Sequence, residues 1–196
     1  LFPYTTLFRS YSMLVFDIKP DEFEYAFSFD GPYEPAKGLF FNEENVLLDP
    51  YSRAVTGQRK WGEKPEGGKD FEYRARVVKS SFDWGNIKQL EQPFEDLVIY
   101  ETHVRGYTKD KSSGVSAPGT FAGLKDKIPY LKDLGINAVE LMPIFEFDEM
   151  ESARVVDGVQ LYNYWGYNTV SFFAPNTSYA FNEEHNHEGD ELKSLI

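Results

Sequence analysis

Seven of the nineteen residues in YNYWGYNTVSFFAPNTSYA, residues 162–180, are aromatic, and none is charged. The chain as a whole is 27% charged. Rings at this density either fill the space between buried strands or line a surface that binds a flat, uncharged ligand. A sugar is one such ligand, because the apolar C–H face of its ring stacks on an aromatic ring. Composition favours an aromatic core, and both interpretations remain open at this point.

A second set of polar residues alternates along an expected strand and its end. Glu101, His103 and Arg105 lie two residues apart, so their side chains share one face. Such a row either forms a structural hydrogen-bond network or lines a pocket. We favour the structural role for these residues and for Glu140 on the next expected strand.

The histidines of EEHNHEG have a spacing that suggests a metal site. His185 and His187 lie two residues apart, but two His without a nearby Cys are a weak zinc signal. We interpret this segment as a solvated loop, and we expect neither a metal ion nor a cofactor.

The acidic charge limits the partners of the chain. The formal net charge is −12 at pH 7, so a polyanion such as nucleic acid would be repelled. No apolar run is long enough to span a bilayer, so we expect no membrane partner. The chain has no cysteine, which fits a reducing compartment, and no signal peptide is recognisable. We therefore expect a cytoplasmic protein.

The charge is also unevenly distributed. Residues 1–90 carry 12 Lys and Arg and 14 Asp and Glu, whereas residues 91–196 carry 8 and 18. This step predicts two units that meet near residue 90.

The first unit has the pattern of a small all-β domain from residue 11 to about residue 85. Residues 23–30, FEYAFSFD, alternate, which predicts a half-buried antiparallel strand that Gly31-Pro32 ends. Residues 62–70 have the composition of an exposed loop. Residues 71–78 alternate again and predict another strand.

The second unit changes to alternating strand and helix. Residues 96–104 begin as a β-branched run, which predicts a strand covered on both faces. A helix is expected from an N-cap at Thr120 to a stop at Gly135, and Pro129 either kinks or restarts it. A second buried strand, residues 136–145, follows, and the two strands of such a unit must be parallel.

Several of these stretches, in this order, resemble the isoamylase-type glycogen and starch debranching enzymes of glycoside hydrolase family 13. YAFSFDGPYEPAKGLFFNEENVLLDPYSRAVTG is similar to the end of the family's N-terminal β-sandwich, a carbohydrate-binding module of family 48. LVIYETHVRGYT is similar to the first barrel strand, GTFAGLKDKIPYLKDLGINAVELMPIFEF to the first helix and second strand, and YWGYNTVSFFAPNTSYA to the loop that follows. The first ten residues do not take part, and we expect them to be foreign to the native protein.

The resemblance implies an α/β plus all-β fold. Residues 11–90 would be the C-terminal part of an Ig-like, early-set β-sandwich with its linker. Residues 91–196 would be the first part of a (β/α)8 TIM barrel, the catalytic domain. A whole barrel needs about 250 residues, so we interpret the chain as a truncated fragment.

The resemblance also implies an activity, which is hydrolysis of α-1,6 branch linkages in glycogen, amylopectin or limit dextrin. A retaining mechanism needs a nucleophilic carboxylate and a carboxyl acid/base about 5 Å apart. In the family these groups lie on later barrel strands, so we expect them beyond Ile196, no catalytic residue in this chain, and no hydrolase activity of the chain alone. Asn186-His187 does not match the family motif Asp-x-x-x-Asn-His, because Asn182 stands in the place of the Asp.

One substrate-binding residue follows from the resemblance. The Tyr of WGY, Tyr167 here, forms the floor of the family's subsite for the sugar on the non-reducing side of the cut bond. Trp165 and Asn168 flank it and are candidates for sugar contact. The other aromatic residues of the segment are expected to pack: Phe172, Phe173 and Tyr179.

The same comparison argues against calcium. Some relatives bind calcium at the positions of Glu146, Phe147 and Glu149, but a phenylalanine cannot ligate a cation that needs oxygen ligands. We therefore expect no calcium here.

Three alternatives remain. A branching transferase shares the two-unit layout and the WGY loop, although YAFSFDGPY and LLDPY favour debranching. A non-catalytic glucan-binding protein would use the sandwich alone. An unrelated α/β domain with an aromatic core is the third alternative.

Overall fold

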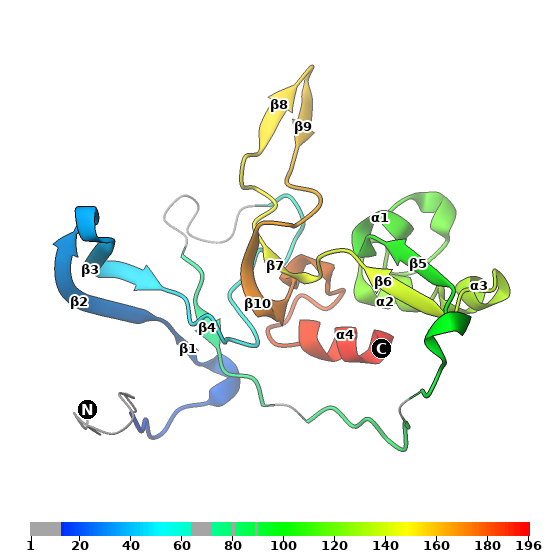
Figure 1. The fold of residues 1–196 in the computed structure, drawn as a ribbon, viewed down its shortest axis with the longest axis horizontal. Helices are drawn as coiled ribbons and strands as arrows, with labels where there is room; N and C mark the ends of the chain where they lie inside the picture. Colours follow the sequence, from blue (N-terminus) through cyan, green and yellow to red (C-terminus); the bar gives the residue numbers. More distant parts are fainter. Residues whose placement is uncertain (1–12, 64–71, 80, 89) are drawn as a thin grey trace.

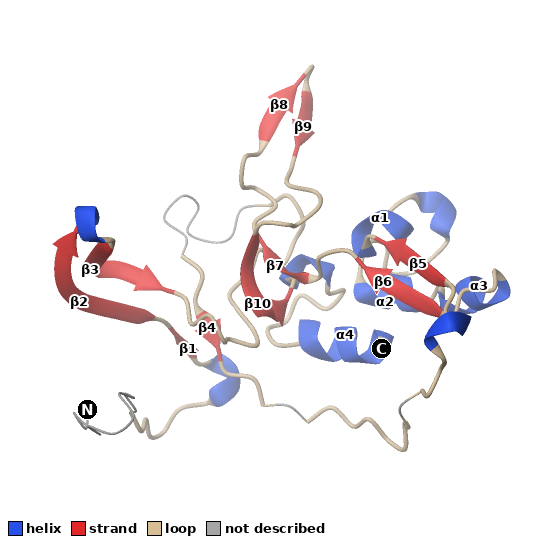
Figure 2. Ribbon diagram, viewed as in Figure 1, coloured by secondary structure: helices blue, strands red, loops and turns tan. Residues whose placement is uncertain are grey.

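The structure is a computed structural model that describes residues 13–63, 72–79, 81–88 and 90–196 (Figure 1). Within these ranges the strands form five two-stranded sheets, and the helices are short (Figure 2). The predictions for residues 1–10 and for most of residues 62–70 lie outside the described residues.

A long β-hairpin dominates the N-terminal half. Strands β2 (Phe27–Glu34) and β3 (Leu39–Leu47) pair antiparallel. They are joined by the 3-10 turn η2 (Pro35–Lys37) and by Gly38, whose φ is 74°. Glycine suits this left-handed position because it has no Cβ.

The predicted end of the first strand at Gly31-Pro32 is wrong, because β2 continues to Glu34. The ladder is irregular around Gly31, where an added Cβ would lie 2.8 Å from the ring of Phe41. Because β2 is an edge strand, a proline without an N–H is tolerated there. These residues bend the strand and do not terminate it.

The aromatic alternation along this strand appears as a row of ring contacts. Ring centroids are 6.3 Å apart for Phe23 and Tyr25, 5.8 Å for Tyr25 and Phe27, and 6.1 Å for Phe27 and Phe29. The predicted half-burial holds for residues 23–26 and is wrong for residues 27–30, because every residue of β2 is exposed. A two-stranded sheet without a second layer leaves its rings in solvent.

Strand β1 (Glu24–Tyr25) follows the 3-10 turn η1 (Pro20–Glu22) and pairs antiparallel with β4 (Ala75–Arg76). Of the predicted strand 71–78, only β4 forms a ladder among the described residues.

Arg76 connects this small sheet to the C-terminal part of the chain. Its side chain is 3% exposed and forms a salt bridge with Glu24. Its guanidinium also donates to the carbonyl of Asp21 at 2.8 Å and to Oδ1 of Asn186 at 3.3 Å. A buried guanidinium needs such partners to offset the cost of its desolvation.

The predicted strand–helix–strand unit is confirmed. Strands β5 (Ile99–Thr102) and β6 (Ala138–Leu141) are parallel and in register from Ile99 opposite Ala138 to Thr102 opposite Leu141. Both strands are shorter than predicted. The 3-10 turn η4 (Phe94–Asp96) precedes β5, and a helix begins after it at Val104.

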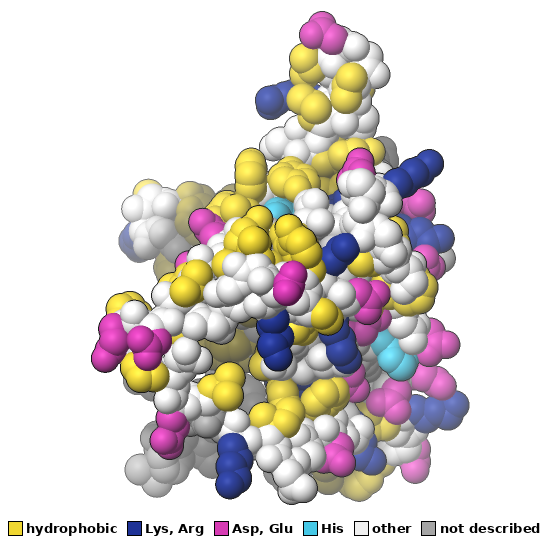
Figure 3. All heavy atoms as spheres, turned by 90° about the vertical axis from the view of Figure 1, so that its right-hand side faces the viewer, with side chains coloured by type: hydrophobic (Ala, Val, Ile, Leu, Met, Phe, Trp, Pro, Cys, Tyr) yellow, Lys and Arg dark blue, Asp and Glu magenta, His cyan; other side chains and the backbone are white. Residues whose placement is uncertain are grey.

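The expected cover on both faces of β5 is absent in the described chain. Ile99 is 51% exposed and Val139 on β6 is 42% exposed. Figure 3 views the molecule from the side of these elements and shows hydrophobic side chains at the surface among charged ones. A pair of parallel strands without further neighbours cannot bury both of its faces.

The predicted helix consists of two helices, α2 (Phe121–Lys125) and α3 (Ile128–Asp133). Oγ1 of Thr120 accepts from the N–H of Gly123 at 3.1 Å, as an N-cap does. Pro129 lies in the first turn of α3, which confirms the restart. Gly135 has φ 92° and ends α3 as predicted. Helix α1 (Val104–Thr108) and the turn η5 (Lys111–Ser113) lie between β5 and α2.

The C-terminal part adds two further sheets and a helix. Strands β7 (Phe145–Phe147) and β10 (Thr169–Pro175) pair antiparallel, and a separate hairpin of β8 (Arg154–Val156) and β9 (Val159–Leu161) stands out from the body (Figure 1). After the turn η6 (Thr177–Tyr179), helix α4 (Glu188–Leu195) packs against α2.

The core lies between these elements. Its buried members come from α1, α2, β7 and η6: Val104, Phe121, Leu124, Phe147 and Tyr179. In the part of the chain that the structure describes, no helix has the length and apolar character needed to cross a bilayer.

Candidate functional site

The loop that follows β9 is held against the C-terminal end of β5. His103 is the residue directly after β5, and its ring stacks on Tyr164 with 4.1 Å between centroids and 7° between planes. The ring of Trp165 stands edge-on to His103 at 6.2 Å. The WGY loop therefore lies at the end of a parallel strand, which is where α/β folds gather ligand-binding groups.

His103 is fixed on both ring nitrogens. Nδ1 accepts from the N–H of Gly106 at 3.0 Å and caps α1, so Nε2 carries the proton and donates to the carbonyl of Tyr164 at 2.8 Å. Burial, with a smaller contribution from the charge of Arg105, lowers the pKa of His103. A neutral imidazole in this tautomer braces the loop, which accords with the structural role expected for His103.

Two glycines let the WGY loop pack closely against the core and against α1. A Cβ on Gly166 would lie 2.5 Å from Cε1 of Phe147, and Gly166 has φ 76°. A Cβ on Gly106 would lie 2.0 Å from the hydroxyl oxygen of Tyr164. Any other residue at Gly166 would push Trp165 and Tyr167 away from the core.

Trp61 completes the support, and the sequence patterns did not reveal it. Its ring stacks on Tyr179 with 6.1 Å between centroids and 8° between planes, and the guanidinium of Arg105 lies 4.5 Å from its centroid. Arg105 thus makes a cation–π contact with Trp61. The segment around Trp61 has no helix or strand periodicity, and Trp61 is its single aromatic residue, so the sequence offered no pattern that would have found it.

The three predicted binding residues are brought together on this loop but differ in their surroundings. Tyr167 is 70% exposed and Trp165 53% exposed, so both present ring surface to solvent. The amide nitrogen of Asn168 donates to Oε2 of Glu151. Of the rings predicted to pack, Tyr179 is buried, whereas Phe172 and Phe173 are exposed. Neither ring is buried as the packing prediction requires, although Phe173 stacks on the exposed ring of Tyr51 with 5.6 Å between centroids.

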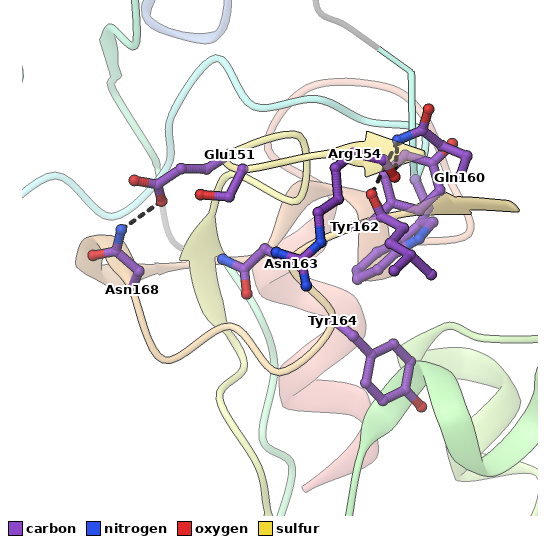
Figure 4. A pocket seen from close by; sticks show the side chains of 10 residues that line it. Glu151, Arg154, Gln160, Tyr162, Asn163, Tyr164 and Asn168 are labelled. Atoms are coloured by element: carbon purple, nitrogen blue, oxygen red, sulfur yellow. Dashed lines mark hydrogen bonds between the residues drawn. The ribbon is translucent and has the colours of Figure 1, made fainter. Parts of the chain in front are cut away.

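A pocket of about 580 Å³ lies beside this loop (Figure 4). Three aromatic residues, three amides and one charge of each sign contribute most of its lining: Trp61, Tyr162, Tyr164, Gln160, Asn163, Asn168, Glu151 and Arg154. Asn168 connects the pocket to the neighbouring Tyr167. Rings with amides and balanced charge suit a neutral, polyhydroxylated ligand.

Two buried carboxyl groups stabilise the site from behind, and the sequence analysis did not foresee this role. Glu146 accepts from the N–H of Thr177 at 2.7 Å, and Glu149 accepts from the N–H of Gly62 at 3.2 Å. Burial raises the pKa of Glu146 well above its usual value and raises that of Glu149 to about 7. Glu146 thus holds the turn before Tyr179, and Glu149 holds the segment that carries Trp61.

These carboxyl groups do not form a metal site with their neighbours. Phe147, between them, packs its ring in the core, and the described residues contain no group of three or more His, Cys, Asp or Glu side chains placed to hold a metal ion. The expectation that calcium is absent stays a prediction.

The two histidines of EEHNHEG lie on the surface. His185 and His187 are both exposed, as predicted for a solvated loop. The prediction is wrong for the rest of the segment, because Asn186 donates to the carbonyl of Val77 at 3.3 Å and Glu188 is buried. Glu101 and Glu140 are opposite each other in the parallel ladder, and both are exposed. They are not part of the network around His103 and Arg105.

Comparisons with known proteins show which proteins the chain resembles. No protein-family model matches the chain. It is 39% identical over 180 residues to "Isoamylase 1, chloroplastic" of Arabidopsis thaliana, covering 88% of this chain and 23% of the relative. It is 36% identical over 181 residues to "Glycogen debranching enzyme" of Yersinia enterocolitica, covering 85% of this chain and 26% of the relative. The chain spans about a quarter of the length of these relatives.

The chain is also similar to solved structures of debranching enzymes, the pullulanases. A pullulanase from Anoxybacillus in complex with maltotetraose has 30% identity and a TM-score of 0.57, covering 77% of this chain and 22% of that chain. A pullulanase type I from Bacillus subtilis in complex with maltose has 27% identity and a TM-score of 0.55 over 80% of this chain and 22% of that chain. The chain is a homologue of the isoamylase-type debranching enzymes, which confirms the predicted resemblance.

Proposed function

We propose that this chain is part of an α-1,6-glucan debranching hydrolase and supplies its substrate platform at Tyr167. The observation that carries the proposal is the fixed WGY loop at the C-terminal end of β5. His103 and Gly166 hold the loop, while the ring of Tyr167 stays 70% exposed. The names of the relatives, isoamylase and glycogen debranching enzyme, support the reaction class.

The domain organisation belongs to the same proposal. Residues 11–90 would be the end of a carbohydrate-binding β-sandwich with its linker, and residues 91–196 the beginning of a (β/α)8 barrel. The parallel register of β5 and β6 supports the second assignment, since adjacent barrel strands are parallel. The β2–β3 hairpin supports the assignment of residues 11–90, because its exposed aromatic side chains suit packing against a second sheet, as in a β-sandwich. Residues 1–10 would be foreign to the native protein.

The proposed chemistry is a double displacement with retention. A carboxylate attacks the anomeric carbon while a carboxyl acid protonates the departing glycosidic oxygen, and water then hydrolyses the glycosyl ester. We place both carboxyl groups beyond Ile196. Within this chain, the face of the Tyr167 ring would stack on a glucose ring, and its hydroxyl would form a hydrogen bond with the sugar. Trp165 and Asn168 add contacts on either side.

The ligand would be a branched α-glucan such as glycogen, amylopectin or limit dextrin. Two structural neighbours hold maltose and maltotetraose, which are linear pieces of such polymers. The cytoplasm remains our proposed compartment, although the Arabidopsis isoamylase is named as chloroplastic.

Binding of maltohexaose to the 196-residue chain tests the platform. Tyr167→Ala is expected to weaken the affinity about tenfold, because it removes a stacking surface worth about 1.4 kcal/mol. Tyr167→Phe should stay within about threefold of the unchanged chain. Tyr130→Ala removes a tyrosine that is 57% exposed on α3 and should change nothing. Equal affinities for Tyr167→Ala and Tyr130→Ala would contradict the platform.

Activity separates the placement of the carboxyl groups from binding. The chain should release no reducing ends from amylopectin under conditions in which it binds maltohexaose. Reproducible hydrolysis by the purified chain would show that the catalytic carboxyl groups lie within it.

A further inference from the structure

The β8–β9 hairpin is a regular two-stranded hairpin with a tight turn. Asp157 has φ 51° and Gly158 has φ 79°, the two left-handed residues of a type I′ turn whose twist matches the strands. Val155 and Val159 are 65% and 59% exposed. Figures 1 and 3 show the hairpin standing clear of the body, with hydrophobic side chains on its surface. So short a hairpin is marginal alone, and its exposed apolar surface suits contact with a ligand.

The base of the hairpin forms one side of the pocket described above. Arg154 and Leu161 are direct cross-strand partners, so they share a face, and both line the pocket. Gln160 folds back, and its amide nitrogen donates to the carbonyls of Arg154 at 3.2 Å and Leu161 at 3.0 Å.

These contacts leave hydrogen-bonding groups of Arg154 and Gln160 available at the edge of the pocket. Within the described chain, neither the guanidinium of Arg154 nor the side-chain oxygen of Gln160 takes part in a hydrogen bond or salt bridge. The guanidinium of Arg154 can therefore donate hydrogen bonds into the pocket, and the side-chain oxygen of Gln160 can accept one there. Adjacent hydroxyl groups of a sugar present the matching acceptors and donors.

The other side of the pocket is aromatic. A Cβ on Gly62 would lie 2.9 Å from Cζ of Tyr162, so the chain next to Trp61 lies directly on the Tyr162 ring. Trp61 is held from behind by Tyr179 and Arg105. Ring surface on one side and a polar rim on the other form a slot that suits a pyranose.

We propose that this pocket binds glucosyl units of an α-glucan as a second contact region, with the β8–β9 hairpin directing the sugar chain from the pocket, past Asn168, onto Tyr167. The inference rests on the proposed function and adds a specificity element to it. The pocket volume of about 580 Å³ is within the usual range for small-ligand sites. The balanced pair of Glu151 and Arg154, with the net charge of −12, favours a neutral ligand over an anionic one.

The test compares a long and a short ligand, maltohexaose and maltotriose, in titrations of the 196-residue chain. Arg154→Ala and Gln160→Ala, made separately, should each weaken maltohexaose binding about fivefold to tenfold, the effect of one lost hydrogen bond. Maltotriose bound at Tyr167 should be affected less than twofold. Val155→Ala, which is paired with Gln160 across the hairpin but does not line the pocket, is the matched control and should bind both ligands like the unchanged chain. Circular dichroism establishes that the hairpin variants keep the fold.

The outcomes separate the two proposals. If Tyr167→Ala weakens binding but both hairpin variants bind maltohexaose like Val155→Ala, the pocket inference is overturned and the platform stands. If the hairpin variants weaken maltohexaose and maltotriose equally, the directed path from pocket to platform is overturned. If the unchanged chain binds neither sugar, both proposals are overturned.

Discussion

His103 stacks on Tyr164 with 4.1 Å between ring centroids while its Nδ1 caps α1 through the N–H of Gly106. One side chain therefore joins the end of β5, the start of α1 and the WGY loop. These contacts position the site. The hydrogen bond from the N–H of Gly106 fixes the His103 ring, and the fixed ring then holds the WGY loop through Tyr164.

Replacing this joint should loosen the loop and the fold together. His103→Ala removes the cap, the bond to the Tyr164 carbonyl and the ring stack, and should lower the free energy of unfolding by about 2 kcal/mol. His187→Ala, which changes an exposed histidine, is the control. Urea unfolding measures both. A His103→Ala loss no larger than that of His187→Ala would show that the joint is not structural.

Gly166 allows a second prediction with a close control. Gly166 and Gly158 have φ of 76° and 79°, but an added Cβ meets the Phe147 ring only at Gly166. Gly158→Ala should cost about 1 kcal/mol for its backbone conformation alone. Gly166→Ala should cost about 2 kcal/mol more, because the ring or the loop must move. Thermal unfolding gives both values, and equal losses would mean that the loop does not press on Phe147.

Glu149 should make stability depend on pH. Burial raises the pKa of Glu149 from 4.5 to about 7. Between pH 4.5 and 7 the unfolded chain has lost this proton and the folded chain keeps it, so the free energy of unfolding falls as pH rises across that window and is level above it. The shift corresponds to a fall on the order of 3 kcal/mol.

Glu149→Gln isolates this effect. It should make the profile less steep between pH 4.5 and 7, where the buried Glu146 still contributes, and make the variant more stable than the unchanged chain at pH 8. Glu95→Gln, at an exposed position, should leave the profile as it was. Urea unfolding at several pH values measures the three curves, and the same slope in all of them would contradict a buried proton on Glu149.

Arg76 should matter more than an exposed arginine. Arg76→Met removes the salt bridge with Glu24 and the bond to Asn186, and should cost about 3 kcal/mol because partly buried partners lose their counterpart. Arg53→Met removes one 3.3 Å bond to the Val78 carbonyl and should cost less than about 1 kcal/mol. Chemical unfolding distinguishes them, and equal costs would show that Arg76 does not connect the two parts.

Local signals in the sequence predicted the local structure well. Thr120 and Gly135 bound the helical region as expected, and Pro129 restarts the helix, because caps and proline act through neighbouring backbone groups. The parallel pairing of β5 and β6 followed from the tight strand–helix–strand spacing. Gly31-Pro32 misled, because whether a breaker ends a strand depends on whether that strand lies at an edge.

The parts of the site that depend on distant contacts could not be predicted. Trp61 meets Tyr179, and Glu149 meets Gly62, across long stretches of chain with no shared periodicity. Phe172 and Phe173 are neighbours in β10 and point to opposite faces, yet both are exposed, and alternation alone does not reveal that neither ring is covered. Tyr167 was selected by family resemblance, and its role remains a proposal.

The packing of Trp61 against Tyr179 and Arg105 has a consequence for the order of folding. The N–H of Arg59 donates to Oγ1 of Thr177, 118 positions along the chain, and Trp61 is two residues after Arg59. Closing so long a loop costs entropy before any contact compensates for it, whereas the β2–β3 hairpin and α2 can form locally. The ring cluster behind the WGY loop must therefore assemble late, so nascent chains acquire their secondary structure before they acquire a surface able to hold a ligand.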